Sequence, residues 1–322
     1  MRIKALKKLD QFLSWSTSEN LKTYVLNDPL EEETFEVDIP EMRTFAAKYG
    51  YFSPLRPIIG KVTTDEVDIK LTCCLLKTLY EKGDELDYLQ FATDEVLTKV
   101  LAYRDLKLGE RIQIPVILQG KIIFSTFTID HLFNLWHGMP AFGLVPEQRE
   151  MEPILLFRGT DFSLDSERGW ASMMSDLDMA GPGLSAFQNS QEEIHAWLHK
   201  VSAKGKKAKV MGFSLGGALA AYTFIYENDG ISSSGSAAFC PPGVANKVIE
   251  DWQSLPEKRR QGFTTYVNEG DLVSKVGKLF GTVYAFLVKR PLKPLSAHTQ
   301  LMSAETFLLK ARIDVQKENE SR

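Results

Sequence analysis

The sequence is poor in cysteine and lacks long apolar runs. Its 322 residues include three cysteines, Cys73, Cys74 and Cys240. An odd number with two adjacent does not fit a disulfide framework, and no pair has the spacing of a zinc site. No apolar run is long enough to span a bilayer, and Met1–Trp15 lacks the apolar core of a signal peptide. We therefore expect a soluble, cytoplasmic protein without metal or cofactor. Export by a route that needs no cleaved signal remains an alternative.

The sequence also has no large excess of charge of either sign. The formal net charge is −4, and no zinc finger or other nucleic-acid signature accompanies the short basic clusters. Hydrophobic residues make up 44% and charged residues 25%, as in ordinary globular proteins. Nucleic acid is therefore not an expected partner.

The pattern of the chain changes near residue 109. Residues 1–108 show apolar side chains at helical spacing, which predicts a helical N-terminal extension or layer. Residues 109–322 alternate short β-rich runs with helices, which predicts crossover units, a mainly parallel sheet and an α/β fold. The expected strands are 112–118, 121–129, 153–157, 209–213, 235–240 and 263–268, and the expected helices are 191–202, 215–226 and 299–315.

A nucleophile is expected at Ser214. The stretch Gly212-Phe213-Ser214-Leu215-Gly216 follows an apolar strand and opens a helix, the context that a G-x-S-x-G elbow requires. The glycines leave room for a sharp turn that exposes the serine Oγ. The new helix directs its free N–H groups towards the place where an oxyanion forms. The alternative is a tight turn that only packs small residues.

A serine needs a base, and the base needs an orienting acid. In an elbow of this type the acid and then the histidine follow the serine, and His298 is the only histidine after Ser214. It is expected in a loop before the last helix. Asp271 follows the strand 263–268 and is the preferred acid, with Glu269 as the fallback. The two other aspartates after Ser214 are not preferred, because Asp229 is expected to cap a helix and Asp251 is expected on a polar helix face.

Several short stretches together resemble the class 3 (fungal-type) triacylglycerol lipases, from about Leu155 to His298. They are Phe157-Arg158-Gly159-Thr160 (F-R-G-[ST]), Trp170 with Asp176-Leu177 (W…D-L), Gly212–Leu219 (G-H-S-L-G-G-A-L), Phe239–Asn246 (F-G-x-P-R-V-G-N) and Val267-Asn268 with Asp271-Leu272-Val273 (V-N…D-x-V).

The resemblance implies an α/β-hydrolase fold and a lipid-ester hydrolase. Ser214, Asp271 and His298 would form the triad. The oxyanion hole would use the backbone N–H of Leu215 with the backbone N–H and hydroxyl of Thr160, and Arg158 would be a structural ion-pair partner. Phe213 replaces the family's histidine, and Cys240, Gly243 and Ala245 alter the fourth stretch, Phe239–Asn246.

The sequence also allows other functions for this site. The same triad serves thioesterases and amidases, and an inactive hydrolase scaffold would act as a membrane or protein interaction factor. The N-terminal helix with Lys4, Lys7 and Lys8 would rest on a membrane surface or pack on the core.

His195 and His199 lie four residues apart on an expected helix, the spacing of a shared metal site, but a solvated helix surface is favoured. Lid candidates are Asp161–Met179 and the apolar segment Val276–Val288. The alternatives for Val276–Val288 are an acyl-chain wall and an ordinary core helix or strand.

Overall fold

The computed structural model describes residues 21–25, 88–99, 101–118, 121–160, 181–227, 229–268, 270–287 and 294–299. The N-terminal helix expected to carry Lys4, Lys7 and Lys8, and the lid candidate Asp161–Met179, lie outside these residues. Among the described helices, none is long and apolar enough to cross a membrane.

A nine-stranded sheet forms the centre of the fold, in the order β1-β9-β8-β7-β6-β5-β4-β3-β2. The strands are β1 (Leu21–Val25), β2 (Arg111–Leu118), β3 (Lys121–Leu135), β4 (Met139–Pro146), β5 (Ile154–Phe157), β6 (Lys209–Phe213), β7 (Ser236–Phe239), β8 (Phe263–Asn268) and β9 (Thr282–Leu287). Strands β2 to β5 form an antiparallel meander, and every pairing from β5 to β1 is parallel. The carboxyl ends of β5 to β9 therefore meet at one edge of the sheet, where parallel sheets bind their ligands.

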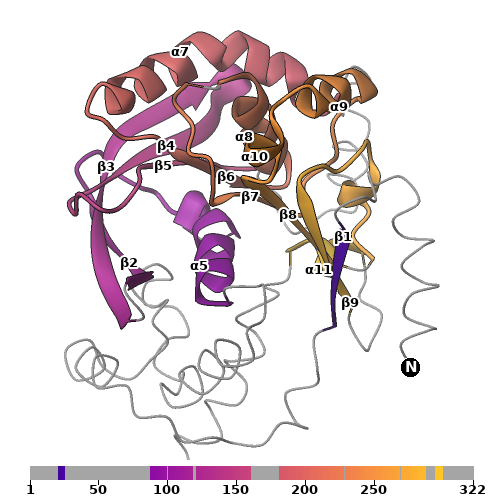
Figure 1. Ribbon diagram of the computed structural model, residues 1–322, viewed down its shortest axis with the longest axis horizontal. Helices are drawn as coiled ribbons and strands as arrows, with labels where there is room; N and C mark the ends of the chain where they lie inside the picture. Colours follow the sequence, from indigo (N-terminus) through magenta and orange to yellow (C-terminus); the bar gives the residue numbers. More distant parts are fainter. Residues whose placement is uncertain are drawn as a thin grey trace, which may run out of the picture.

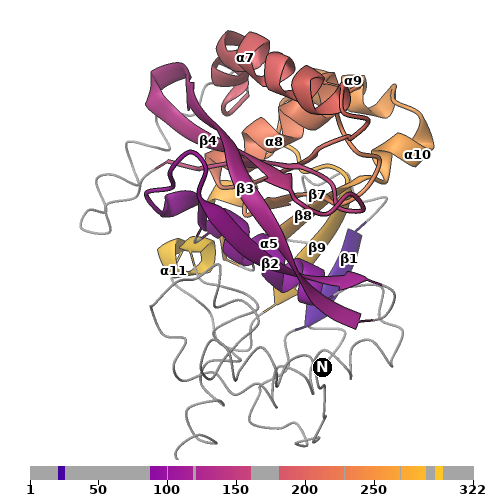
Figure 2. The same cartoon turned by 90° about the vertical axis from the view of Figure 1, so that its left-hand side faces the viewer.

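Helices cover both faces of the sheet (Figure 1). They are α5 (Tyr88–Lys99), α7 (Leu184–Ser202), α8 (Leu215–Tyr226), α9 (Asn246–Gln253), α10 (Glu257–Arg260) and α11 (Pro294–Thr299), with the 3-10 turns η4 (Leu101–Tyr103), η5 (Trp136–Gly138) and η6 (Val273–Lys275). Helices α7, α8 and α9 lie on one face, and α5 lies on the other, against β2, β5, β6 and β7 (Figure 2). The mainly parallel sheet between two helical layers is the predicted α/β-hydrolase fold.

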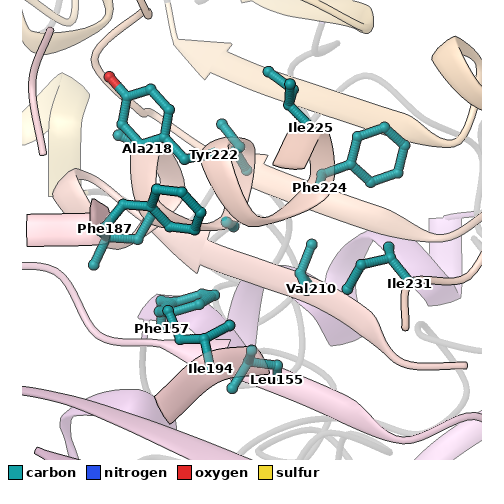
Figure 3. Close-up of a cluster of buried hydrophobic side chains, with 14 of the residues drawn as sticks. Leu155, Phe157, Phe187, Ile194, Val210, Ala218, Tyr222, Phe224, Ile225 and Ile231 are labelled. Atoms are coloured by element: carbon teal, nitrogen blue, oxygen red, sulfur yellow. The ribbon is translucent and has the colours of Figure 1, made fainter. Parts of the chain in front are cut away.

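The largest core cluster lies between the sheet and the α7–α8 layer. Helix α8 is apolar around almost its whole circumference, and ten of its residues are buried, as expected for a helix enclosed by other elements. Side chains of β5, β6, α7 and α8 meet there, including Phe157, Val210, Ile194 and Tyr222 (Figure 3). This packing fixes the position of α8, and with it the turn at its amino end.

Several expected elements are confirmed residue for residue. Strand β6, helix α8 and strand β8 have the expected bounds, and Val276–Val288 contributes strand β9, which confirms its reading as core rather than lid. Other expectations were incomplete. Helix α7 begins at Leu184 rather than Gln191, and β3 continues to Leu135 through an irregularity between Ile129 and His131.

Two strands were not foreseen. Strand β4 was missed, and β1 lies in the part expected to be helical. Both β1 and α5 precede residue 109 and join the sheet, by pairing with β9 and by packing. The division into 1–108 and 109–322 stays a prediction.

The core gives a first testable prediction. Phe224 on α8 is fully buried, and its ring centroid lies 5.1 Å from that of Phe263 on β8. Replacing Phe224 with alanine removes these contacts and leaves a cavity. We expect Phe224→Ala to lower the free energy of unfolding by about 3–5 kcal/mol in urea titrations. Leu108→Ala is the matched control, because Leu108 is 66% exposed, and it should change stability by less than about 0.5 kcal/mol. A loss below about 1 kcal/mol for Phe224→Ala would contradict this packing.

Candidate active site

Ser214 occupies a strained turn between β6 and α8. Its backbone has φ 54° and ψ −129°, a conformation that residues with a side chain rarely adopt. The turn depends on missing side chains, because a Cβ atom at Gly212 would collide with the carbonyl oxygen of Gly216. A hydrogen bond of 3.0 Å from the Ser214 N–H to the carbonyl of Phe239 ties the turn to β7. The sequence therefore folds here into the predicted nucleophile elbow.

The end of β5 packs directly against this elbow. A Cβ atom added at Gly216 would lie 2.6 Å from the carbonyl oxygen of Phe157, and one added at Gly159 would lie 3.1 Å from the Cβ of Ser214. Thr160 follows Gly159 and is half-buried. The two segments expected to supply oxyanion donors, Thr160 and the first residue of α8, Leu215, thus flank the serine.

Three side chains from distant parts of the chain form one hydrogen-bonded row. The His298 Nε2 atom lies 2.9 Å from the Ser214 Oγ, and its Nδ1 atom lies 3.1 Å from an Asp271 carboxylate oxygen. Because the carboxylate can only accept, we assign the imidazole proton to Nδ1, which leaves Nε2 to accept from the serine hydroxyl. Ser214 is 1% exposed, and His298 and Asp271 are fully buried. This is the geometry of a serine nucleophile, its base and an orienting acid.

Asp271 is held by its own turn. One of its carboxylate oxygens accepts the N–H of Val273 at 2.9 Å, and the other accepts the Ser274 hydroxyl at 2.6 Å. The Asn268 side-chain amide donates to the carbonyl of Ala297 at 2.9 Å, which ties the strand before the acid to the residue before the base. Ser274 and the amide of Asn268 were not predicted. The available signal was the spacing of an aspartate and a serine three residues apart, which is typical of a hydrogen-bonded turn.

The other acids considered have different surroundings. Asp251 bonds to Lys247 at 3.0 Å and to the Tyr226 hydroxyl at 2.8 Å on the far helical layer. Asp229 follows α8 and lies near Arg259, whose charge it stabilises. Glu269 lies outside the described residues. Among the acids that the structure describes, Asp271 is the one that contacts His298.

The position of His298 in the fold differs from expectation. It lies within α11, Pro294–Thr299, and not in a loop before the last helix. Pro294 is well suited to a first helical position and starts this helix ahead of the expected helix 299–315, of which only Thr299 is described. Residues 300–322 lie outside the described part.

Phe213, which replaces the family's histidine, packs behind the elbow. Its ring centroid lies 4.7 Å from that of His298 at an interplanar angle of 34°. It also lies 6.2 Å from the ring of Tyr103, over which Arg158 is stacked at 4.9 Å. The base is therefore supported by an aromatic surface.

Cys240 lies beside the acid and the base. Its backbone has φ 45°, a left-handed conformation that favours the glycine found there in the resembled family. Its Sγ, an Asp271 oxygen and a His298 nitrogen lie within 4.8 Å of one another. An ion among them would have to break the Asp271–His298 hydrogen bond, and burial raises the pKa of the Cys240 thiol, which keeps it a protonated and poor ligand at neutral pH. We therefore assign these groups to the serine row rather than to a metal.

The two histidines considered as a metal pair, His195 and His199, lie on helix α7. His195 Nδ1 contacts a Glu227 carboxylate oxygen at 2.7 Å, and its side chain is 65% exposed. His199 is exposed, with its ring centroid 6.4 Å from that of His195. Both histidines therefore lie on a solvated helix surface, as the sequence analysis favoured.

Comparison with protein families agrees with this geometry. The family model described as "Lipase (class 3)" matches residues 154–280. Over these residues, the chain is similar to the class 3 lipase family. The matched segment begins at β5 and includes the elbow and Asp271, whereas His298 follows it. A search of curated proteins gives no match.

Solved lipase structures are similar to this chain at low identity. The native Rhizomucor miehei lipase propeptide complex shares 19% identity over 60% of this chain and 63% of that chain, with a TM-score of 0.39. Lip2 lipase from Yarrowia lipolytica shares 15% over 69% and 83%, with a TM-score of 0.39. A triacylglycerol lipase whose catalytic centre is described as a serine protease triad shares 21% over 46% and 59%, with a TM-score of 0.35. The chain thus spans about half to three-fifths of the length of several of the lipase chains that it matches.

The support of Asp271 can be tested through the reactivity of Ser214. Ser274→Ala removes a buried hydrogen bond to a carboxylate, a contact worth about 1.5–3 kcal/mol. We expect the rate at which a fluorophosphonate labels Ser214 to fall about 10- to 100-fold, because the acid then orients the base less firmly. Ser254→Ala is the control, since the exposed Ser254 hydroxyl bonds only locally, to the carbonyl of Asp251 at 2.6 Å. Equal labelling rates in the two variants would show that Ser274 does not support the acid.

Proposed function

We propose that the chain is a serine hydrolase that cleaves the carboxylic esters of lipids through an acyl-enzyme on Ser214. The single observation that carries this proposal is the buried row Ser214–His298–Asp271, with contacts of 2.9 and 3.1 Å. It is supported by the strained elbow that presents the serine and by the match of residues 154–280 to the class 3 lipase family model. No step of this chemistry requires a cofactor.

The proposed mechanism is acyl transfer in two stages. His298 takes the proton of Ser214 through Nε2 as the Oγ atom attacks the ester carbonyl carbon, and Asp271 stabilises the resulting imidazolium. The N–H of Leu215 and the N–H and hydroxyl of Thr160 hold the oxyanion. The imidazolium then protonates the departing alcohol. Water repeats the same steps on the acyl-enzyme and releases the carboxylic acid.

A lipid ester is the substrate class that the family and the site favour together. The described catalytic groups are 0–1% exposed, so a substrate reaches them only after part of the chain moves. An enzyme that is closed in water and opens at a lipid surface would couple this movement to the presence of its substrate. We rank acylglycerols first among the candidate substrates, phospholipids second and short soluble esters third. The proposal includes contact of the expected N-terminal helix with a membrane surface, and the residues of that expected helix lie outside the described part of the chain.

The rival readings use the same site in different ways. A thioesterase or amidase would employ the same three side chains, and matched ester, thioester and amide substrates separate them by relative rate. An inactive scaffold acting as an interaction factor would not need the base to contact the serine. The short His298–Ser214 contact therefore favours an enzyme.

The decisive variant is Ser214→Ala. We expect hydrolysis of p-nitrophenyl esters to fall at least about 10⁴-fold, to background, because no group replaces the nucleophile. Rates should increase with acyl length and rise sharply above the micellar concentration. Ser234→Ala, at an exposed serine in the turn before β7, is the control and should keep wild-type rates. If wild type is inactive on every ester, or if Ser214→Ala is as active as wild type, the proposal is wrong.

A further inference from the structure

Helix α5 brings an ion pair beneath the active site. The Lys99 ammonium lies 2.9 Å from a Glu95 carboxylate oxygen, and the two side chains are 2% and 0% exposed. The helix packs on the face of β6 and β7 opposite to α8, directly behind the elbow. Burying two charges is costly, and such a pair is often replaceable by apolar residues without loss of stability. A contribution to stability alone therefore does not explain why charges are found here.

The cationic end of this pair points towards the row of catalytic groups. Lys99 Nζ lies 5.4 Å from the centroid of the Phe213 ring, and the His298 ring centroid lies 4.7 Å from the same point. Together these distances put the ammonium within about 10 Å of the imidazole. At Cys240, beside Asp271, the charge of Lys99 acts more strongly than that of Glu95, and Asp271 in turn attracts Lys99.

Lys99 is charged at neutral pH. Burial by itself lowers the pKa of the Lys99 ammonium, but the carboxylates of Glu95, foremost, and of Asp271 outweigh burial and hold that pKa above its ordinary value. A fixed positive charge at this distance favours the Asp271 carboxylate and opposes a second positive charge on His298.

We propose that Lys99, held in place by Glu95, is a positioning residue of the catalytic row whose buried charge keeps the base neutral at lower pH. The charge acts through Asp271 and beside the Phe213 ring, without touching substrate. This inference rests on the proposed function, because it assigns a task to the neighbours of the same triad. The described groups that face His298 are Ser214, Cys240 and Asp271, with Lys99 and Glu95 behind Phe213 and with Tyr103 and Arg158 at the edge of that ring.

The test measures how fast a fluorophosphonate labels Ser214 as a function of pH, with non-ionic detergent present to open the site. The acid limb of this profile reports protonation of the base. We expect Lys99→Met to move the limb up by as much as about one pH unit, the interaction of two charges about 10 Å apart at an effective dielectric of about 20. Glu95→Gln should move it down, and the double variant should lie between the two.

The matched control is Lys200→Met, which removes a half-exposed lysine paired with Asp130 at 2.8 Å on the opposite helical layer. It should leave the limb in place. Lys99→Arg keeps the charge and should keep the wild-type limb; together with Glu95→Gln it provides the test if Lys99→Met does not fold. Limbs that stay at the wild-type pH, or that move in the same direction in Lys99→Met and Glu95→Gln, would overturn the proposal, since a structural role predicts no opposed shifts.

The outcome also separates this proposal from the one above. Labelling with the opposed shifts, but without ester hydrolysis, would support the role of Lys99 and refute lipid-ester cleavage. Ester hydrolysis with unmoved limbs would refute the role of Lys99 alone. No labelling of wild type at any pH would refute both.

Discussion

The sharp turn at Ser214 is the constraint on which the rest of the site depends. Its positive φ is unfavourable by about 1–3 kcal/mol and persists only where the surrounding structure holds it. The packing of α8 into the largest core cluster provides this hold, because the first turn of the helix cannot unwind without exposing buried apolar surface. The absence of side chains at Gly212 and Gly216 lets β6, α8 and the end of β5 approach closely enough to enclose the serine.

The acid and the base depend on a second set of backbone contacts. The turn after β7 pairs with the segment before β9, through hydrogen bonds of 2.9 Å in both directions between Val244 and Lys278. A Cβ atom at Gly243 would collide with the backbone of Lys278, which explains why a glycine stands where the resembled family has an arginine. This contact braces the loop that carries Asp271. The bond from Asn268 to Ala297 then places the base relative to that loop.

The sequence predicted those parts whose signals are local. The apolar run of β6 and the Ala-rich run of α8 meet at a glycine-flanked serine, and the only later histidine left one choice of base. Strand β4 was missed because Met139–Pro146 contains Gly143 and two prolines, which are unfavourable in strands. Gly143 is required by a tertiary contact, since a Cβ atom there would lie 2.5 Å from the ring of Trp197. Such a contact leaves no trace in local periodicity.

Helix α5 shows the same limit for electrostatics. Its apolar spacing indicated a helix, yet Thr93, Asp94, Glu95 and Thr98 are buried along with Val96 and Leu97. Residues of these polar types are mostly exposed in folded proteins. In the fold Asp94, Glu95 and Thr98 are bonded within the helix, as in the Thr98 hydroxyl to the Asp94 carbonyl at 2.9 Å and the Gln90 amide to the Asp94 carboxylate at 2.6 Å. The buried Thr93 hydroxyl has no hydrogen-bond partner among the described residues. A helix can carry charge into an interior when its charged groups find partners there. The charge behind the elbow is thus a property of tertiary packing, and residues outside the family-matched segment set the electrostatic surroundings of the residues within it.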